Sequence, residues 1–338
     1  MRDLISILGA VATHRIKFVD CYPSWSYLPN NYILTRLRPH FNLEIVDEPD
    51  YLFYSVIGFE HAHPRYDHCV KIWFTDENFR PNFSNCDYAV SFDYLADEPR
   101  HLRLPNYVKD LVPGELVKTA SFNPEAILKS KTRFSSFICS NNEAQTRLLF
   151  YRKLSAYKPV DSAGSVFNNM GYRAAPGLAG PRGKLEFITP YKFSIAFENS
   201  RYPGYTTEKI VAPMKINSLP IYWGNPLIAR EFNPKSFINC NDYPSLDDVV
   251  DEVVQLDQDD DRYLSMLSEP WFNDNIENEY CQFCYGNSFF AKVFSTPVHT
   301  YSKWSGVTPR NFGIIDDMPG FVRDDNLIIG PSERRVFE

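Results

Sequence analysis

The chain has 338 residues, of which 44% are hydrophobic and 15% aromatic, so it is long enough to form two domains with a core each. Its formal net charge of −7 excludes a general affinity for nucleic acid or anionic membranes but permits a local basic pocket. No apolar run reaches the ~18 residues of a membrane span. We expect the short apolar patch Leu4–Val11 to be a folded N-terminal segment rather than a signal peptide.

The first half of the chain alternates short apolar runs with polar segments. The stretch Asn30–Arg38 predicts a helix. Strands are predicted at His14–Cys21, Leu43–Val46, Asp50–Val56, Val70–Phe74 and Cys86–Phe92. This alternation indicates an α/β domain with a parallel, Rossmann-like sheet. The more irregular stretch Leu111–Lys131 is the candidate linker.

The second half repeats the α/β alternation. We expect the strand Arg133–Cys139, the helix Glu143–Ala156, a strand near Val160–Asp161, and the helices Asp247–Leu256 and Asp259–Leu267. The segment Ala174–Gly183 is rich in Gly, Pro and Ala and predicts a flexible surface loop. The sequence therefore predicts two α/β halves.

Two features suggest metal binding at first sight. The acidic run Asp257–Arg262 could be mistaken for a metal-binding DxD motif, but no strand precedes it, so we expect a solvated, helix-capping loop. Among the seven cysteines, Cys281 and Cys284 form a CxxC, which lacks the two further ligands that zinc needs. We expect no metal site, and reduced, non-catalytic thiols if the protein is cytosolic.

The most informative stretch is Tyr191–Gly224. Its apolar run Phe193–Phe197 predicts a buried parallel strand, a polar turn follows, and Thr206 or Thr207 can cap a helix. With Leu219–Trp223 as the next strand, this is a βαβ unit, whose loop lies where open α/β sheets bind ligands.

The beginning of that helix carries Glu208 and Lys209. Free N–H groups, the helix dipole and the lysine favour a phosphate, while the glutamate can accept hydrogen bonds from sugar hydroxyls. An ordinary crossover with a solvated Glu-Lys pair is the alternative for so short a motif.

The longer string FENSRYPGYTTEKI, followed by PIYWG, resembles the donor-binding motif of the α1,3/α1,4-fucosyltransferases that use GDP-fucose, glycosyltransferase family 10. The fixed positions of that motif are matched by Phe197, Glu198, Asn199, Ser200, Tyr205, Thr207, Glu208, Lys209, Pro220 and Gly224. The segment is most similar to the bacterial branch. The resemblance implies a GT-B fold, with two Rossmann-like domains facing across a cleft.

Two further segments resemble the same family. KIWFTDENFRPNF is similar to its acceptor-side motif, which implies that Glu77 is the catalytic base, with Asp76 as a rival. FSSFICSNNEAQTRLLFY is similar to a donor-side segment, which implies that Ser140, Asn141 and Arg147 contact GDP. The resemblance adds Asn199, Tyr205, Thr207, Glu208 and Lys209 to the donor site, and leaves Asn168 and Asn169 as guesses near the nucleotide.

The resemblance implies an acceptor-side domain over residues 1–125, a GDP-fucose-binding domain over 126–305, and a C-terminal segment, 306–338, packing back on the first domain. It implies inverting transfer of L-fucose from GDP-β-L-fucose to a GlcNAc or Glc hydroxyl of an oligosaccharide, in α1,3 linkage. A GT-B enzyme using another nucleotide sugar and a non-catalytic glycan-binding protein are the alternatives.

The same resemblance implies that no cofactor or metal is required, with stimulation by a divalent cation left open. The expected partners are GDP-fucose and a GlcNAc-containing acceptor, and not nucleic acid. We expect a cytoplasmic bacterial protein without a transmembrane span, with peripheral contact to the inner membrane left open.

Overall fold

The computed structural model describes residues 12–21, 31–174 and 183–299, and these residues form two compact α/β units. Unit 1 contains residues 12–104 and 283–299 of the described chain, and unit 2 contains residues 105–282. In these ranges no helix has the length and apolar character needed to cross a bilayer. The patch Leu4–Val11, most of the loop Ala174–Gly183 and residues 306–338 lie outside the described residues.

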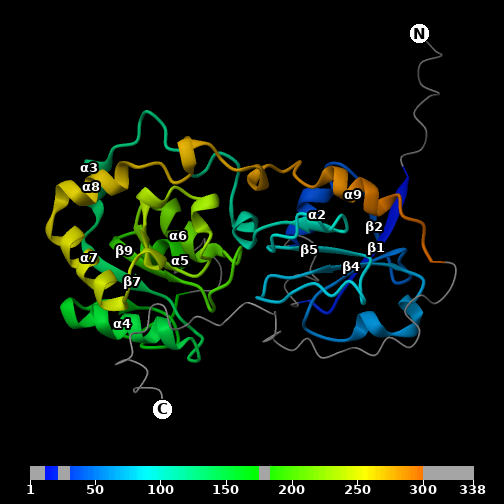
Figure 1. Cartoon of the computed structure of the whole chain (residues 1–338), viewed down its shortest axis with the longest axis horizontal. Coiled ribbons are helices and arrows are strands. Elements are labelled where there is room, and N and C mark those ends of the chain that lie inside the picture. The colour runs from blue at the N-terminus through cyan, green and yellow to red at the C-terminus, as the bar shows by residue number, and fades with distance from the viewer. Residues whose placement is uncertain (1–11, 22–30, 175–182, 300–338) are drawn as a thin grey trace, which may run out of the picture. The chain divides into compact units, whose positions relative to one another are not determined.

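Unit 1 is built on a six-stranded parallel sheet in the order β2-β1-β3-β4-β5-β6 (Figure 1). Its strands are β1 (Thr13–Val19), β2 (Asn42–Ile45), β3 (Tyr51–Tyr54), β4 (Val70–Phe74), β5 (Tyr88–Ser91) and β6 (His101–Arg103). All five predicted strands are confirmed, and the three-residue β6 was not predicted. Every residue of β3, β4 and β5 is buried, as expected for central parallel strands.

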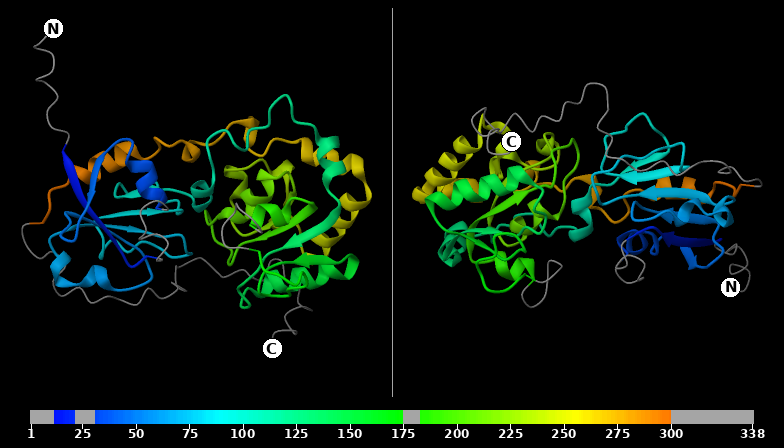
Figure 2. Two further views of the ribbon diagram at one scale, coloured as in Figure 1. Left: turned by 180° about the vertical axis from the view of Figure 1, so that it is seen from behind. Right: turned by 90° about the horizontal axis from the view of Figure 1, so that it is seen from below.

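Two α-helices lie among the described residues of unit 1. The predicted first helix is confirmed as α2 (Tyr32–Leu37), and Asn31 caps it by accepting hydrogen bonds from the next turn. Helix α9 (Asn287–Phe294) was not predicted, and it packs beside the sheet (Figures 1 and 2). The Tyr51 hydroxyl donates to the Phe294 carbonyl at 2.7 Å, and the Phe294 ring stacks on His14.

Unit 2 has a five-stranded parallel sheet in the order β11-β10-β9-β7-β8. Its strands are β7 (Arg133–Phe137), β8 (Val160–Ser162), β9 (Tyr191–Phe197), β10 (Leu219–Trp223) and β11 (Ile238–Asn239). The predicted βαβ unit is confirmed as β9, α6 and β10. Among the described strands of this unit, the two-residue β11 was not predicted, and helix α5 (Lys184–Ile188) was not predicted either.

The helices of unit 2 surround this sheet (Figure 1). They are α3 (Pro124–Ser130), α4 (Gln145–Tyr157), α5 (Lys184–Ile188), α6 (Glu208–Lys215), α7 (Leu246–Gln258) and α8 (Asp260–Ser268). Helix α6 packs on β9 and β10, and α7 packs on both α4 and α8. The predicted helices near residues 143–156, 247–256 and 259–267 are confirmed as α4, α7 and α8.

The boundaries of the two units differ from the predicted domain boundaries at two places. Residues 105–125 belong to unit 2, where the 3₁₀ helix η4 (Asn106–Asp110) packs against α6 and the Tyr107 N–H donates to the Thr206 carbonyl. Helix α9 belongs to unit 1 although it lies within residues 126–305. The expected irregular linker Leu111–Lys131 also contains α3, which Asn123 caps.

The acidic run Asp257–Arg262 is not wholly the solvated loop that the sequence suggested. Asp259 does cap α8, as expected. Asp259 is, however, the only residue between α7 and α8, and Asp257 lies in the last turn of α7. The Asp257 side chain is only 5% exposed and forms ion pairs with Lys158 and Lys192. The hydrogen bond from Lys158 and the charge of Lys192 lower its pKa, although burial alone would raise it.

We expect Asp257→Asn to lower the free energy of unfolding by about 1.5–3 kcal/mol at pH 7, the usual contribution of a charged hydrogen bond. Because the folded-state pKa lies below the ordinary 3.8, this contribution is present above pH 3.8 and disappears as the pH falls through the folded-state value. Urea unfolding at pH 7 and at pH 3 measures it. Asp261→Asn, at an exposed position of the same run, is the matched control, and equal losses in both variants would contradict the assignment.

Candidate functional site

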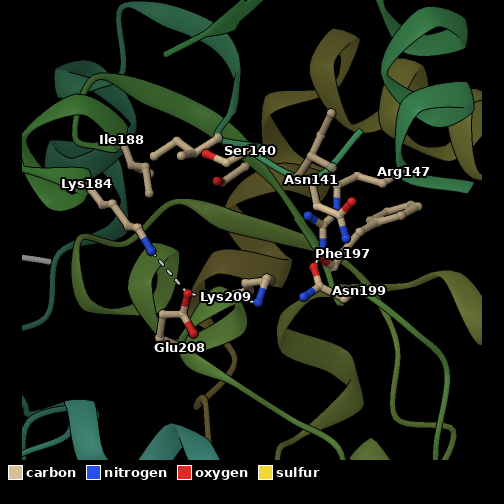
Figure 3. A pocket seen from close by; sticks show the side chains of 12 residues that line it. Ser140, Asn141, Arg147, Lys184, Ile188, Phe197, Asn199, Glu208 and Lys209 are labelled. Atoms are coloured by element: carbon tan, nitrogen blue, oxygen red, sulfur yellow. Dashed lines mark hydrogen bonds and ion pairs between the residues drawn. The ribbon is translucent and has the colours of Figure 1, made fainter. Parts of the chain in front are cut away.

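A pocket of about 280 Å³ lies in unit 2 (Figure 3). It is formed by residues that follow β7, by the second half of β9 and the turn after it, by the short helix α5, and by the first turns of α4 and α6. Its lining residues are Ile138, Ser140, Asn141, Arg147, Lys184, Ile188, Ser194, Ile195, Phe197, Asn199, Glu208 and Lys209. The sheet is parallel, so this is the carboxyl edge at which α/β folds bind ligands.

A buried carboxylate organises the entry to α6. Glu198 is fully buried, and it accepts hydrogen bonds at 2.8 Å from both the N–H and the hydroxyl of Thr207. The Lys209 ammonium lies 3.2 Å from Glu198 and donates to the Thr207 hydroxyl at 2.9 Å. A Cβ at Gly224 would lie 2.5 Å from the Glu198 side chain, so only glycine fits there.

Glu208 lies between two ammonium groups at the pocket wall. Its carboxylate is 3.1 Å from Lys184 Nζ and 3.9 Å from Lys209 Nζ. Burial alone would raise the pKa of Glu208, but the charges of Lys209, Lys184 and Lys109 outweigh it and hold this pKa well below its usual value. Glu208 is therefore an anion near neutral pH and a ready hydrogen-bond acceptor.

Arg147 enters the pocket from the first turn of α4 and is only 4% exposed. Its guanidinium donates to the Phe197 carbonyl and, at 2.9 Å, to the Asn199 side chain. Arg147 thereby fixes the end of β9 while it lines the pocket. Arg147, Lys184 and Lys209 face a single lining carboxylate, Glu208, so the lining residues carry a net positive charge that suits a diphosphate.

Most of the residues predicted for the donor site are brought together in this pocket. Ser140, Asn141, Arg147, Asn199, Glu208 and Lys209 line it. Thr207 does not; it caps α6. Tyr205 is 2% exposed and is not among the lining residues. The guessed Asn168 and Asn169 instead fasten their own loop, since each side-chain amide donates to a nearby backbone carbonyl.

Two charged residues at the site were not given a role from the sequence. Lys184 follows a Gly/Pro-rich stretch, and nothing around it in the sequence indicates a pocket. Glu198 was recognised as part of the motif, but its function as the buried partner of Thr207 and Lys209 appears only in three dimensions.

Glu77 belongs to unit 1, on the loop that follows β4, and its side chain is partly exposed. Hydrogen bonds hold the loop on both sides of Glu77. The Glu77 N–H donates to the Thr75 hydroxyl at 3.0 Å, and Arg80 donates to the Asn78 side chain. Arg80 also pairs with the buried Asp93 at 3.3 Å. A carboxylate is thus held at the carboxyl edge of the unit 1 sheet.

Comparison with protein families covers both units. The model described as the alpha-(1,3)-fucosyltransferase FucT N-terminal domain matches residues 16–109. The model described as glycosyltransferase family 10 (fucosyltransferase) C-term matches residues 128–285. The chain belongs to glycosyltransferase family 10, the fucosyltransferases.

Individual relatives agree with this membership. The chain is 33% identical over 276 residues to alpha-(1,3)-fucosyltransferase FucT of Helicobacter pylori, covering 73% of this chain and 56% of that one. It is 29% identical over 211 residues to human GDP-fucose protein O-fucosyltransferase 3, covering 59% and 44%. The chain spans about half the length of the curated relatives it matches.

Solved structures confirm the predicted GT-B class. A crystal structure of an α1,3-fucosyltransferase with GDP is similar with a TM-score of 0.71 and 27% identity, over 87% of this chain and 94% of that chain. The same comparison with a GDP-fucose complex gives a TM-score of 0.68 and 27% identity, over 86% and 93%.

We expect Arg147→Ala and Lys209→Ala each to weaken GDP binding by about 1.5–3 kcal/mol, or roughly 10- to 150-fold, because each removes a positive charge from the pocket. Calorimetric titration with GDP measures this loss. Arg152→Ala removes an exposed arginine from the same helix and should bind GDP like the unchanged protein. Thermal unfolding of each variant separates lost binding from lost folding, and unchanged affinity in both pocket variants would remove these residues from the site.

Proposed function

We propose that this protein transfers L-fucose from GDP-β-L-fucose to a hydroxyl of a GlcNAc- or Glc-containing glycan, forming an α1,3 linkage with inversion. The observation that carries the proposal is the pocket of Arg147, Lys184, Glu208 and Lys209 in a chain of fucosyltransferase family 10. A GDP-fucose complex among the similar structures supports the identity of the donor.

In the proposed reaction, the acceptor oxygen forms a bond to the anomeric carbon of fucose while the bond from that carbon to the phosphate oxygen breaks. GDP leaves with the bonding electrons, and Arg147 and Lys209 stabilise its developing charge. Glu208, an anion near neutral pH, accepts hydrogen bonds from the ribose hydroxyls. The acceptor proton passes to the Glu77 carboxylate, so that one base suffices and no covalent intermediate forms.

One further acceptor class has a specific observation in its favour. Human GDP-fucose protein O-fucosyltransferase 3 is among the relatives, and its name describes transfer to protein. A protein hydroxyl would need the same base and the same donor pocket. The experiment therefore offers both kinds of acceptor.

The direct test is incubation of the protein with GDP-fucose and separate acceptors: N-acetyllactosamine, lacto-N-biose, chitobiose, and a folded protein domain with accessible Ser or Thr. We expect GDP release and an α1,3-fucosylated product with a sugar acceptor, and the same rate in excess EDTA, since we propose that the leaving group is neutralised by side chains. GDP-mannose and UDP-glucose are the donor controls. Transfer from one of these instead, or total loss in EDTA restored by Mn²⁺, would contradict the proposal.

We expect Glu77→Gln to lower kcat by roughly 10²- to 10⁴-fold and to leave GDP affinity nearly unchanged, because the base acts on the acceptor rather than on the donor. Asp76→Asn is the neighbouring control and should retain most of the activity. Steady-state kinetics and GDP titration together separate the two effects. If Asp76→Asn abolished turnover while Glu77→Gln did not, the aspartate would be the base.

A further inference from the structure

The segment between β3 and the 3₁₀ helix η2 (Glu60–Ala62) is held by one aspartate that follows β1. The Asp20 carboxylate accepts hydrogen bonds from the Glu60 N–H at 2.8 Å, from the His61 N–H at 2.9 Å and from His61 Nδ1 at 2.6 Å. Its own carbonyl accepts from the Ile57 N–H at 3.0 Å. Both ends of the segment 57–61 are therefore fastened to the end of β1.

The middle of the segment is fixed as well. A Cβ on Gly58 would lie 2.6 Å from the Asp20 carboxylate, so the backbone passes directly against that group. The side chains of Asp20 and His61 are each 5% exposed, and His61 stacks on the Tyr54 ring at 4.1 Å. Asp20 also adopts a φ of 54°, which is unfavourable for a residue other than glycine. A buried pair and a strained backbone persist only where the surroundings over-determine them, and such arrangements gather at functional sites.

Two of the residues that this fixed segment exposes to solvent are apolar, and they precede the exposed Glu60, which pairs with Arg65. Ile57 is 47% exposed and Phe59 is 56% exposed, two residues apart on the same short stretch. An aromatic ring on a rigid support loses little conformational entropy when a ligand covers it. The segment is thus a pre-organised apolar surface.

The segment lies at the edge of the sheet that also carries Glu77. Strands β3 and β4 are parallel neighbours, with Tyr54 opposite Trp73, so the chain leaves both at the same edge, towards Phe59 and towards Glu77. Strand β2 pairs with one edge of β1, and the next strand in the chain, β3, pairs with the opposite edge. The strand order therefore reverses between β1 and β3, which is the topological switch point of the sheet. Ligands of parallel α/β sheets bind at this point, outside the carboxyl ends of the strands.

We propose that Phe59, with Ile57 beside it, is the platform on which the acceptor sugar lies while its hydroxyl is presented to Glu77. This inference rests on the proposed function. The C–H face of a pyranose ring is apolar and matches an aromatic face, whereas its hydroxyls project to the rim. The occupant is a single sugar ring rather than a protein surface, because two side chains fall far short of the ~800 Å² per partner that a stable protein interface buries.

The test is steady-state kinetics with N-acetyllactosamine varied at saturating GDP-fucose. We expect Phe59→Ala to raise the acceptor KM roughly 3- to 10-fold, with kcat changed less than twofold and GDP affinity unchanged. Phe59→Trp, which keeps an aromatic face, should stay within about twofold of the unchanged protein. Phe283→Ala, which removes another half-exposed phenylalanine of unit 1, is the matched control and should have no effect.

Gly58→Ala is a second test, because the added Cβ shifts the backbone of the segment while the Phe59 side chain itself is retained. It should also raise the acceptor KM. An acceptor KM that is unchanged in Phe59→Ala, or raised equally in Phe283→Ala, overturns the proposal. An effect on a protein acceptor alone, with the sugar unaffected, overturns it in favour of a protein-docking surface.

Failure of the proposed function can be told apart from failure of the platform. If the unchanged protein transfers no fucose to any acceptor, the function is wrong, and N-acetyllactosamine binding to the GDP-loaded protein is then measured directly by saturation-transfer NMR. Sugar binding that is lost in Phe59→Ala but kept in Phe283→Ala supports the platform. Equal binding in both variants, or no binding to the unchanged protein, overturns it.

Discussion

The candidate donor site depends on the burial of one carboxylate, that of Glu198. An isolated ionised carboxyl group in a protein interior is very unfavourable, and Glu198 is tolerated because the Thr207 N–H, the Thr207 hydroxyl and the Lys209 ammonium all converge on it. These contacts join the end of β9 to the beginning of α6. They also explain Gly224 on the following turn, since any side chain there would overlap Glu198. The motif is thus one packed unit rather than a set of separate ligand contacts.

This arrangement settles the charge of the pocket before any ligand arrives. Lys209 is held by Glu198, Lys184 is held by Glu208, and Arg147 is held by the Phe197 carbonyl and Asn199. Each cation therefore has a fixed position without being fully neutralised at the pocket surface. Fixed positive groups stabilise a leaving diphosphate more effectively than mobile ones, because they need not reorganise as charge develops.

The sequence predicted those elements of the fold whose contacts are made by residues close together in the chain. The unit β9, α6 and β10 follows from an apolar run, a turn and a capping threonine, all within Tyr191–Gly224. Helix α9 could not be assigned to unit 1 in this way, because Tyr51 and His14, which hold Phe294, lie more than 240 residues earlier. Polar side chains with distant partners were missed for the same reason.

Asp257 illustrates that limit: only its ion pairs with Lys158 and Lys192 distinguish it from the exposed acids around it. The site shows the same division. Six of the predicted donor residues line the pocket, and the family resemblance had identified them as a group. No sequence pattern indicated Lys184 or the buried pair of Asp20 and His61. Tyr205, matched by the motif, lies buried away from the pocket lining, so a matched position need not be a contact.

The two units differ in the physical means of recognition that they offer. The pocket of unit 2 presents three cationic side chains among its lining residues. Such charges recognise a diphosphate without distinguishing the group attached to it, so Arg147 and Lys209 alone cannot select fucose. Unit 1 offers a carboxylate on the loop after β4 and, after the neighbouring strand β3, an apolar surface at Phe59. Apolar contact depends on the shape and orientation of the ligand, and it discriminates among acceptors only if the surface is rigid. In the proposed platform, that rigidity comes from Asp20, whose φ of 54° is positive, and from the buried His61 that bonds to it.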